Sequence, residues 1–358
     1  MGILQHWKYG LRYVEGIRMS KCLISIIMPT FNSEKTLEES LKSIREQQID
    51  QEQVEILILD GGSTDSTLEI AKKYKATVLK NERRLPEFAK QIGLMEARGK
   101  YGIFIDSDEA FTNVQSLANR VRCLEKHPKV KNVVSTGQIC KNGEQGVNRY
   151  ANFIGDPFSN YVYRFNGYNR IEDISKQYDC EDIGDALLVD FTDSEYLPLF
   201  DALGNMFEIK TAREIYFQTN ENKSFAANIF SNMVQQTKCA ILMKEDRICH
   251  QPGLSRKTYL NKLKWRVKNN LFQAEGVGFA ERSKKESGLQ KRKLLFIPYC
   301  VLIVPVIVDA VRLAIKNKDG YFLNHFWYTE YTFLMIVWYV ILKLIHYPVK
   351  MDKTYGKK

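Results

Sequence analysis

The sequence lacks paired cysteines, a hydrophobic leader and any uncharged run long enough to cross a bilayer as one straight helix. Its seven cysteines form no C-x-x-C pair and are odd in number, which favours a reduced, intracellular setting. The first residues have no continuous apolar core, so we expect no secretory signal there. Residues 294–308 and 331–342 are uncharged, but their 15 and 12 residues are fewer than the ~20 of a spanning helix.

The composition is that of a globular protein, with 358 residues, 44% hydrophobic and 26% charged. The net charge of +10 is distributed unevenly. Residues 1–255 contain 32 basic and 35 acidic side chains, residues 256–293 contain 12 and 3, and residues 294–358 contain 8 and 4. A near-neutral domain is a poor nucleic-acid binder, so we expect no nucleic-acid partner. A basic segment beside the most apolar part of the chain predicts contact with anionic membrane lipid.

This patterning divides the chain into four predicted parts. Residues 1–20 have apolar side chains at helical spacing and predict an amphipathic helix. Residues 21–255 form the predicted catalytic domain, and residues 256–293 are the basic juxtamembrane segment. Residues 294–358 are expected to be membrane-associated, either as a hydrophobic helical hairpin or as interfacial helices, followed by a short basic tail.

Apolar runs alternate with helical patterns in the first part of the catalytic domain, which predicts strand–helix–strand units in a mostly parallel sheet with helices on both faces. The runs are nearly continuous, as in strands that are covered on both sides. Asn32 or Ser33 is the predicted cap of the first intervening helix. The predicted strands are residues 22–28, 54–59, 76–79 and 101–105.

Polar motifs follow three of these strands. Residues 29–32 follow the first strand, residues 60–67 the second and residues 106–108 the fourth. Asp and Gly often end strands simply to make turns. Three such motifs at one sheet edge are more informative, because open α/β sheets bind ligands at the carboxyl ends of their strands.

These motifs resemble the family 2 glycosyltransferases, whose GT-A fold is a Rossmann-like α/β domain that binds nucleotide sugars. The resemblance is dense over residues 22–110 and loose over residues 111–255. It implies the GT-A fold for the catalytic domain and sugar transfer from a nucleotide-diphosphate donor. The segments that carry it are residues 29–32, 60–65, 89–93 and 106–108.

The resemblance also implies which residues bind the donor. Asp60 would accept from the base, which agrees with the chemistry of a carboxylate, and Lys90 would lie near the diphosphate, which suits a cation. A UDP-sugar is the favoured donor, although Asp60 alone leaves guanosine open. The complete predicted donor-binding set is Pro29, Thr30, Asn32, Asp60, Gly61, Ser63, Lys90 and Asp106.

Asp106 and Asp108 match the family's Asp-x-Asp motif, which implies a divalent cation. An oxygen-only pair suits Mg²⁺ or Mn²⁺ better than zinc. Such a cation neutralises the charge that develops on a diphosphate leaving group. His250 is a further predicted ligand by resemblance, and a structural role for this histidine is the alternative.

The predicted catalytic base is the point where the sequence departs from the family. The family's carboxylate pair corresponds to Ala226 and Ala227, which cannot accept a proton. Glu221, Asp201 and Glu208 are the remaining candidates. The sequence therefore predicts an inverting glycosyltransferase with an unusual base, and a catalytically silent nucleotide-sugar-binding or scaffold protein is the alternative.

The basic segment and apolar tail together predict where such an enzyme works. They imply a lipid-linked or membrane-proximal acceptor, because a water-soluble acceptor requires neither. Positive charge beside membrane segments favours the cytoplasmic side, so the catalytic domain is expected there. Assembly of lipid-linked glycans or polysaccharides is the expected setting.

Overall fold

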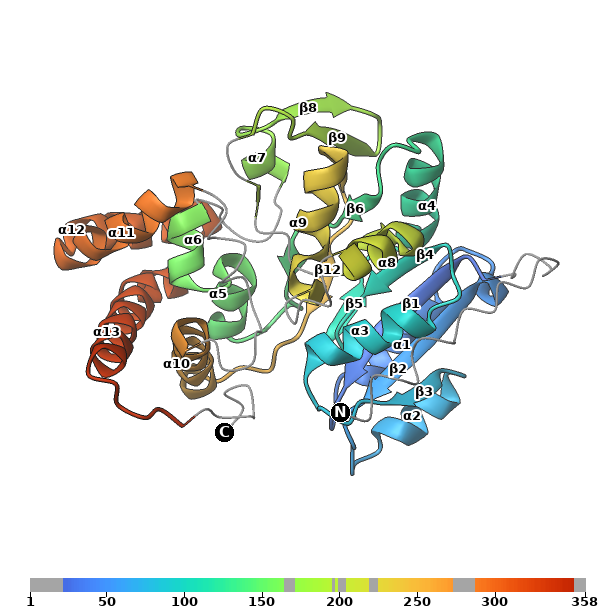
Figure 1. The fold of residues 1–358 in the computed structure, drawn as a ribbon, viewed down its shortest axis with the longest axis horizontal. Coiled ribbons are helices and arrows are strands. Elements are labelled where there is room, and N and C mark those ends of the chain that lie inside the picture. Colours follow the sequence, from blue (N-terminus) through green and yellow to red (C-terminus); the bar gives the residue numbers. More distant parts are fainter. Residues whose placement is uncertain are drawn as a thin grey trace.

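The computed structural model describes residues 22–163, 171–194, 197–198, 204–218, 225–272 and 287–350. The predicted helix of residues 1–20 and part of the basic segment 256–293 lie outside them. Figure 1 shows a sheet domain on one side of the molecule and a group of C-terminal helices on the other.

The sheet domain is built on nine strands in the order β3-β2-β1-β4-β10-β6-β11-β9-β8. The first four strands in this order are parallel, whereas β10 is antiparallel to both of its neighbours. The four predicted strands and their parallel arrangement are confirmed, whereas the sheet as a whole is mixed, because four of its eight pairings are antiparallel. The strands are β1 (Ile24–Thr30), β2 (Val54–Asp60), β3 (Thr77–Lys80), β4 (Tyr101–Phe104), β6 (Asn132–Val134), β8 (Asp179–Asp182), β9 (Ala186–Asp190), β10 (Met206–Glu208) and β11 (Cys239–Met243).

Helices cover both faces of this sheet, as predicted. Ile26 and Met28 of β1 pack in one buried cluster with the apolar face of α1, and Ile27 points into the other cluster. This alternation is what a strand covered on both sides requires. The helices of the domain are α1 (Leu37–Arg45), α2 (Thr67–Lys73), α3 (Pro86–Glu96), α4 (Ser116–Lys126), α5 (Gly146–Ile154), α6 (Pro157–Tyr163), α7 (Ile171–Ile174), α8 (Ile209–Gln218), α9 (Phe225–Thr237) and the 3₁₀ turn η1 (Gln51–Gln53).

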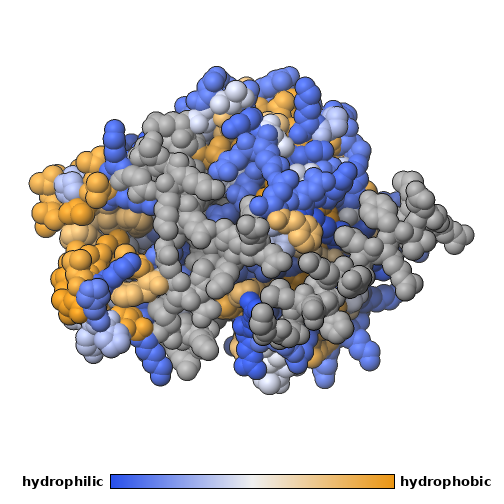
Figure 2. Space-filling view, viewed as in Figure 1, coloured by the Kyte–Doolittle hydropathy of each residue, from blue (hydrophilic) through white to orange (hydrophobic). Residues whose placement is uncertain are grey.

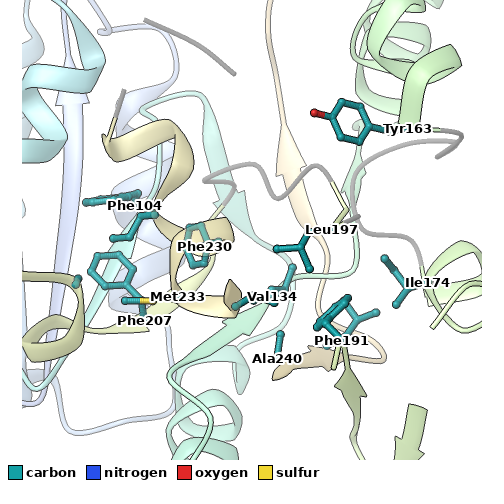
Figure 3. Packing of buried hydrophobic residues seen from close by; sticks show 14 of the residues in the cluster. Phe104, Val134, Tyr163, Ile174, Phe191, Leu197, Phe207, Phe230, Met233 and Ala240 are labelled. Atoms are coloured by element: carbon teal, nitrogen blue, oxygen red, sulfur yellow. The ribbon is translucent and has the colours of Figure 1, made fainter. Parts of the chain in front are cut away.

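Three phenylalanines join the sheet to α9 in the larger cluster (Figure 3). The rings of Phe104 on β4 and Phe207 on β10 are 4.7 Å apart, and the ring of Phe230 on α9 lies 5.9 Å from that of Phe207. All three side chains are fully buried. Tilted and edge-on ring contacts of this kind add to the free energy gained from apolar burial.

A second, three-stranded sheet lies at the end of β4. Its strands are β5 (Glu109–Phe111), β12 (Ile248–His250) and β7 (Gln138–Ile139), with β12 in the centre. The antiparallel register of β5 and β12 pairs Glu109 with His250. This small sheet therefore brings a segment from late in the chain next to the Asp-x-Asp motif.

The C-terminal helices pack on α5 and α6 rather than on the main sheet (Figure 1). Tyr150 of α5 is completely buried among Tyr259, Phe322 and Tyr328. Its hydroxyl also lies 2.7 Å from Nδ1 of His325. The elements of this unit are α10 (Arg256–Phe272), α11 (Ser287–Val301), α12 (Val304–Asn317), η3 (Gly320–Asn324) and α13 (His325–Leu344).

Within the described residues, no single helix has both the length and the apolar composition to cross a membrane, although the bent pair α11 and α12 passes that test as a unit. The two helices meet at 95°, and Ile303 at the bend has a φ of 61°. Many apolar side chains of this unit are exposed, and Figure 2 shows them gathered at one end of the molecule. We call this the apolar surface; it comprises Leu294, Leu295, Ile297, Val301, Leu302, Ile303, Val304, Ile307, Val308, Val311, Ile315, Trp327, Leu334, Val337, Trp338, Val340, Ile341 and Leu344.

Candidate active site

Asp60 organises the loop that follows β2. Its Oδ2 accepts hydrogen bonds from the backbone N–H groups of Gly62 and Ser63, at 2.8 and 2.9 Å. Its Oδ1 accepts from the hydroxyls of Ser63 and Thr30, at 2.5 and 3.2 Å. Four donors match the acceptor capacity of one carboxylate. In the structure, Asp60 therefore stabilises this turn. Its contact with a nucleotide base stays a prediction.

Asn32 joins the loop after β1 to the loop after β2. Its backbone N–H donates to Ser63 Oγ at 2.9 Å, and its side-chain Oδ1 accepts from the N–H of Thr64 at 2.8 Å. With a φ of 48°, Asn32 adopts a left-handed conformation that asparagine tolerates better than most residues. The predicted cap is wrong, because α1 begins after Thr36 and the Asn32 side chain is used between the two loops.

The remaining donor-site predictions lie along the same edge. Pro29 and Thr30 end β1 and pair with Leu59 and Asp60 of β2. The N–H of Gly61 donates to the carbonyl of Thr30 at 2.9 Å. The predicted donor-binding residues of the first two loops are thus brought together in space.

Arg84 was not predicted, yet it lies against these loops. Its guanidinium is 5.9 Å from the ring centroid of Phe31. It also lies next to Gly62, since a Cβ placed on that glycine would be 3.5 Å from Arg84 Nη2. The only signal for it in the sequence is the pair of arginines at 83 and 84, just before the residues that form α3. An arginine here is suited to a phosphate or a base.

Lys90 on α3 and Asp106 after β4 form an ion pair, with 3.0 Å between Nζ and Oδ1. Burial lowers the pKa of Lys90, but the carboxylates of Asp106 and Glu109 outweigh this effect and raise it above its ordinary value. Lys90 is therefore a fixed cation at the end of β4. This placement agrees with a contact to a diphosphate, which stays a prediction.

Glu109 is a buried carboxyl behind the Asp-x-Asp motif. Its Oε2 accepts from the backbone N–H of Asp106 at 2.9 Å, and its Oε1 accepts from the side-chain amide of Gln138 at 3.3 Å. Burial and the nearby carboxylates of Asp106 and Asp108 raise the pKa of Glu109 well above its usual range. Glu109 thus holds the motif's backbone in place from inside the protein.

Asp108 and His250 face each other, with 3.6 Å between Oδ2 and Nε2. Two ligands of one Mg²⁺ ion, each about 2.1 Å from it, are at most roughly 4.2 Å apart, so this pair fits a shared cation. Asp106 lies instead against Lys90, and among the described residues no three acidic, histidine or cysteine side chains converge on one point. The structure therefore does not assemble the predicted trio of Asp106, Asp108 and His250.

The candidate bases are separated from this site or lie outside the described residues. Glu208 ends β10 beside Tyr101 at the start of β4, whereas Asp106 follows the end of β4. Its carboxylate also pairs with Lys131 at 3.1 Å. Glu208 is therefore wrongly predicted as a base, because β10 runs antiparallel to β4. Glu221 and Asp201 lie outside the described residues.

A buried arginine supports the turn that leads into β10. Gly204 has a φ of 58°, and a Cβ on it would lie 2.8 Å from Ile248 Cδ1. Arg120 on α4 is fully buried, donates to the Gly204 carbonyl and pairs with Asp246 at 2.6 Å. Asn205 Oδ1 accepts from the N–H of Ser135 at 2.8 Å. Arg120 was missed in the sequence, because a single arginine on a helix gives no sign of burial.

Comparisons with known proteins point to one family. Residues 25–183 match the family model described as glycosyl transferase family 2. A Methanococcus voltae protein named dolichyl N-acetyl-alpha-D-glucosaminyl phosphate 3-beta-D-2,3-diacetamido-2,3-dideoxy-beta-D-glucuronosyltransferase is 28% identical over 83% of this chain and 89% of its own. Poly(ribitol-phosphate) beta-N-acetylglucosaminyltransferase TarS of Staphylococcus aureus (strain Mu50 / ATCC 700699) is 32% identical over 29% of this chain, but the match spans only 19% of TarS.

A solved structure shares the fold. The mannosyltransferase PcManGT from Pyrobaculum calidifontis, solved in complex with GDP-Man and Mn²⁺, superposes with a TM-score of 0.53 over 91% of each chain at 15% identity. At this identity the likeness concerns the fold alone. The predicted GT-A fold is confirmed by it.

Proposed function

Because the chain belongs to glycosyl transferase family 2 over residues 25–183, we propose that it transfers a sugar from a UDP-sugar to a lipid-linked acceptor. The observation that carries this proposal is the meeting of three polar elements at one sheet edge. They are the Asp60 turn, the Lys90–Asp106 pair and the facing pair of Asp108 and His250. The M. voltae relative, named for a dolichyl phosphate-linked sugar, supports the acceptor class.

Asp108 and His250 would hold Mg²⁺ or Mn²⁺, as one carboxylate and one imidazole leave positions for solvent and diphosphate oxygens. When bound, the cation supplies Lewis-acid neutralisation of the leaving diphosphate. Lys90 adds a positive charge at the same edge of the sheet. The turn around Asp60 and Asn32, held in shape by the hydrogen bonds of the Ser63 hydroxyl to both residues, would bind the nucleoside.

Transfer with inversion is part of the proposal and requires a base for the acceptor hydroxyl. With Glu208 at the other end of β4, Glu221 and Asp201 are the proposed candidates.

The second candidate function is a catalytically silent nucleotide-sugar-binding or scaffold protein. The observation that favours it is the absence of a carboxylate at positions 226 and 227, at the start of α9.

We also propose that the apolar surface rests on the cytoplasmic leaflet of a membrane. Its 18 residues form a patch of a kind that isolated soluble proteins rarely expose. Lys291, Arg292 and Lys293 precede it and Arg312 and Lys316 lie within it, which complements anionic lipid headgroups. Because of the bend at Ile303, α11 and α12 would both approach the membrane from the same side.

The function is tested by offering the purified full chain UDP-, GDP- and TDP-sugars with Mn²⁺, and either membrane lipid extract or soluble sugars as acceptor. The expected result is transfer from a UDP-sugar to the lipid extract alone. Equal transfer to soluble sugars would overturn the acceptor class. Donor binding without any transfer or hydrolysis would favour the silent alternative.

A further inference from the structure

His250 is held by two side-chain amides from different elements. Its Nδ1 lies 2.8 Å from Oδ1 of Asn152 on α5 and 3.1 Å from Oε1 of Gln138 on β7. Its other ring nitrogen, Nε2, is the atom that faces Asp108 at 3.6 Å. The hydrogen bonds made by the two amides decide which ring nitrogen carries the proton.

The orientation of the Asn152 amide is fixed by its own donors. Its Nδ2 donates to the carbonyl oxygens of His250 and Ile139, at 2.8 and 3.3 Å, and to Cys140 Sγ at 3.0 Å. A flipped amide would place its oxygen against two carbonyl oxygens. The oxygen of Asn152 therefore faces the ring, and Nδ1 must donate to it.

Gln138 is oriented in the same way. Its Nε2 donates to Glu109 Oε1 at 3.3 Å, which turns Oε1 toward Nδ1 of His250. With two acceptors on one side, Nδ1 carries the proton. The neutral ring then has its lone pair on Nε2, on the side of Asp108.

We propose that Asn152 and Gln138 are positioning residues that fix His250 in the Nδ1–H form and aim its Nε2 lone pair toward Asp108. A neutral imidazole whose Nδ1–H is hydrogen-bonded is a pre-oriented ligand for a divalent cation through Nε2. This role for the arrangement rests on the proposed function. Neither residue belongs to a sequence motif, and both are fully enclosed, at 3% exposure each.

α5 is built to hold this position. On its polar face, Asn152 donates to the His250 carbonyl at 2.8 Å. Its opposite side carries Tyr150 and Phe153 into the cluster formed with the C-terminal helices. The amide of Asn152 is therefore mounted on a helix anchored on both sides.

The test uses the full chain labelled with ¹⁵N-histidine, with the His250 signal assigned from a His250→Gln variant. Ring ¹⁵N shifts report the tautomer without any metal or substrate. The native chain is expected to show the Nδ1–H form, and Asn152→Ala a mixture of both forms. The affinity for Mn²⁺ in the presence of UDP is expected to fall roughly 10- to 100-fold in this variant. The electron spin-echo modulation from a bound imidazole nitrogen is expected to weaken with it.

Asn148→Ala is the matched control, because Asn148 lies on the same helix, is equally buried and contacts Leu254 instead of His250. It is expected to leave the tautomer and the Mn²⁺ affinity unchanged. If Asn152→Ala fails to fold, Gln138→Met removes the other acceptor at similar size and is expected to shift the tautomer in the same direction.

An Nε2–H form in the native chain would overturn the inference, as would an unchanged tautomer in Gln138→Met and Asn152→Ala. The result is separable from the proposed function. A chain that shows the tautomer shift but transfers no sugar contradicts the proposed function alone, while transfer with an unchanged tautomer contradicts this inference alone.

Discussion

Lys90 and Asp106 form their ion pair with unequal exposure, since the Lys90 side chain is 12% exposed and that of Asp106 is 45% exposed. The cation is thus fixed inside the protein while its partner carboxylate reaches toward solvent. Because a buried lysine moves little, an anion that arrives at this edge meets a charge already in place. The pair gives the site a preset positive end beside Asp108.

Replacing Lys90 with Met is expected to raise the KM for the donor by about tenfold or more, because a hydrogen bond to a charged group contributes about 1.5–3 kcal/mol. Lys100→Met is the matched control. Lys100 forms an ion pair with Glu125 at 2.6 Å, near the start of β4, and both partners are half-exposed. Steady-state kinetics would contradict the assignment of Lys90 if both variants changed the KM equally.

The Arg120–Asp246 pair predicts a large loss of stability on truncation. Arg120→Met would leave Asp246 as a buried and unpaired charge, which typically costs about 3–5 kcal/mol. Arg122→Met, on the same helix, removes an exposed contact of 3.9 Å to Asp185 and should cost less than about 1 kcal/mol. Urea unfolding of the two variants measures the difference, and equal losses would show that Arg120 has no special role.

We predict that the burial of His325 makes the free energy of unfolding depend on pH. Burial lowers its pKa to about 4 from an ordinary value of 6.5, and nearby Asp309 offsets this only in part. As the pH falls, the unfolded chain therefore binds the proton first, so stability declines between about pH 6.5 and pH 4, by roughly 3 kcal/mol in full. His325→Gln should lose this decline.

The measurement for His325 is the free energy of unfolding of both proteins near neutral pH and near pH 4.5. The advantage of the native chain over His325→Gln should shrink at the lower pH. A constant difference between the two proteins at both values would refute the assignment.

The apolar surface predicts lipid binding that depends on the bend between α11 and α12. Replacing Leu302 and Ile303 with Glu should abolish sedimentation with vesicles of phosphatidylglycerol, because it places two charges at the exposed tip. Phe217→Glu is the control, since Phe217 is equally exposed on α8, outside this surface. Retained vesicle binding in the double variant would refute the membrane contact at this tip.

The first half of the fold was predictable, because its strands are buried on both faces and their apolar runs are nearly continuous. The second half was not, since β10 contributes only three residues and inserts antiparallel between β4 and β6. Such a short strand has no pattern of its own. The error over Glu208 follows from this, because chain order does not reveal strand direction.

The site was predictable where residues follow one another in sequence, as in the Asp60 turn and the Asp-x-Asp motif. It was not predictable where single polar residues act from a distance, as with Arg120 and Asn152. A lone arginine or asparagine on an amphipathic helix is usually solvated. Only the packing of α4 and α5 shows that these two are buried and engaged.

The central claim is that this chain releases UDP from a UDP-sugar through a site built around Asp108. The most direct measurement is Mn²⁺-dependent UDP release by the native chain and by Asp108→Asn, with lipid extract as acceptor. Asp182→Asn, at the far edge of the sheet, is the control. We predict release by the native chain and the control, and a loss of roughly 100-fold or more in Asp108→Asn at unchanged Tm. No release by the native chain from any UDP-sugar, or equal release by Asp108→Asn, would contradict the claim.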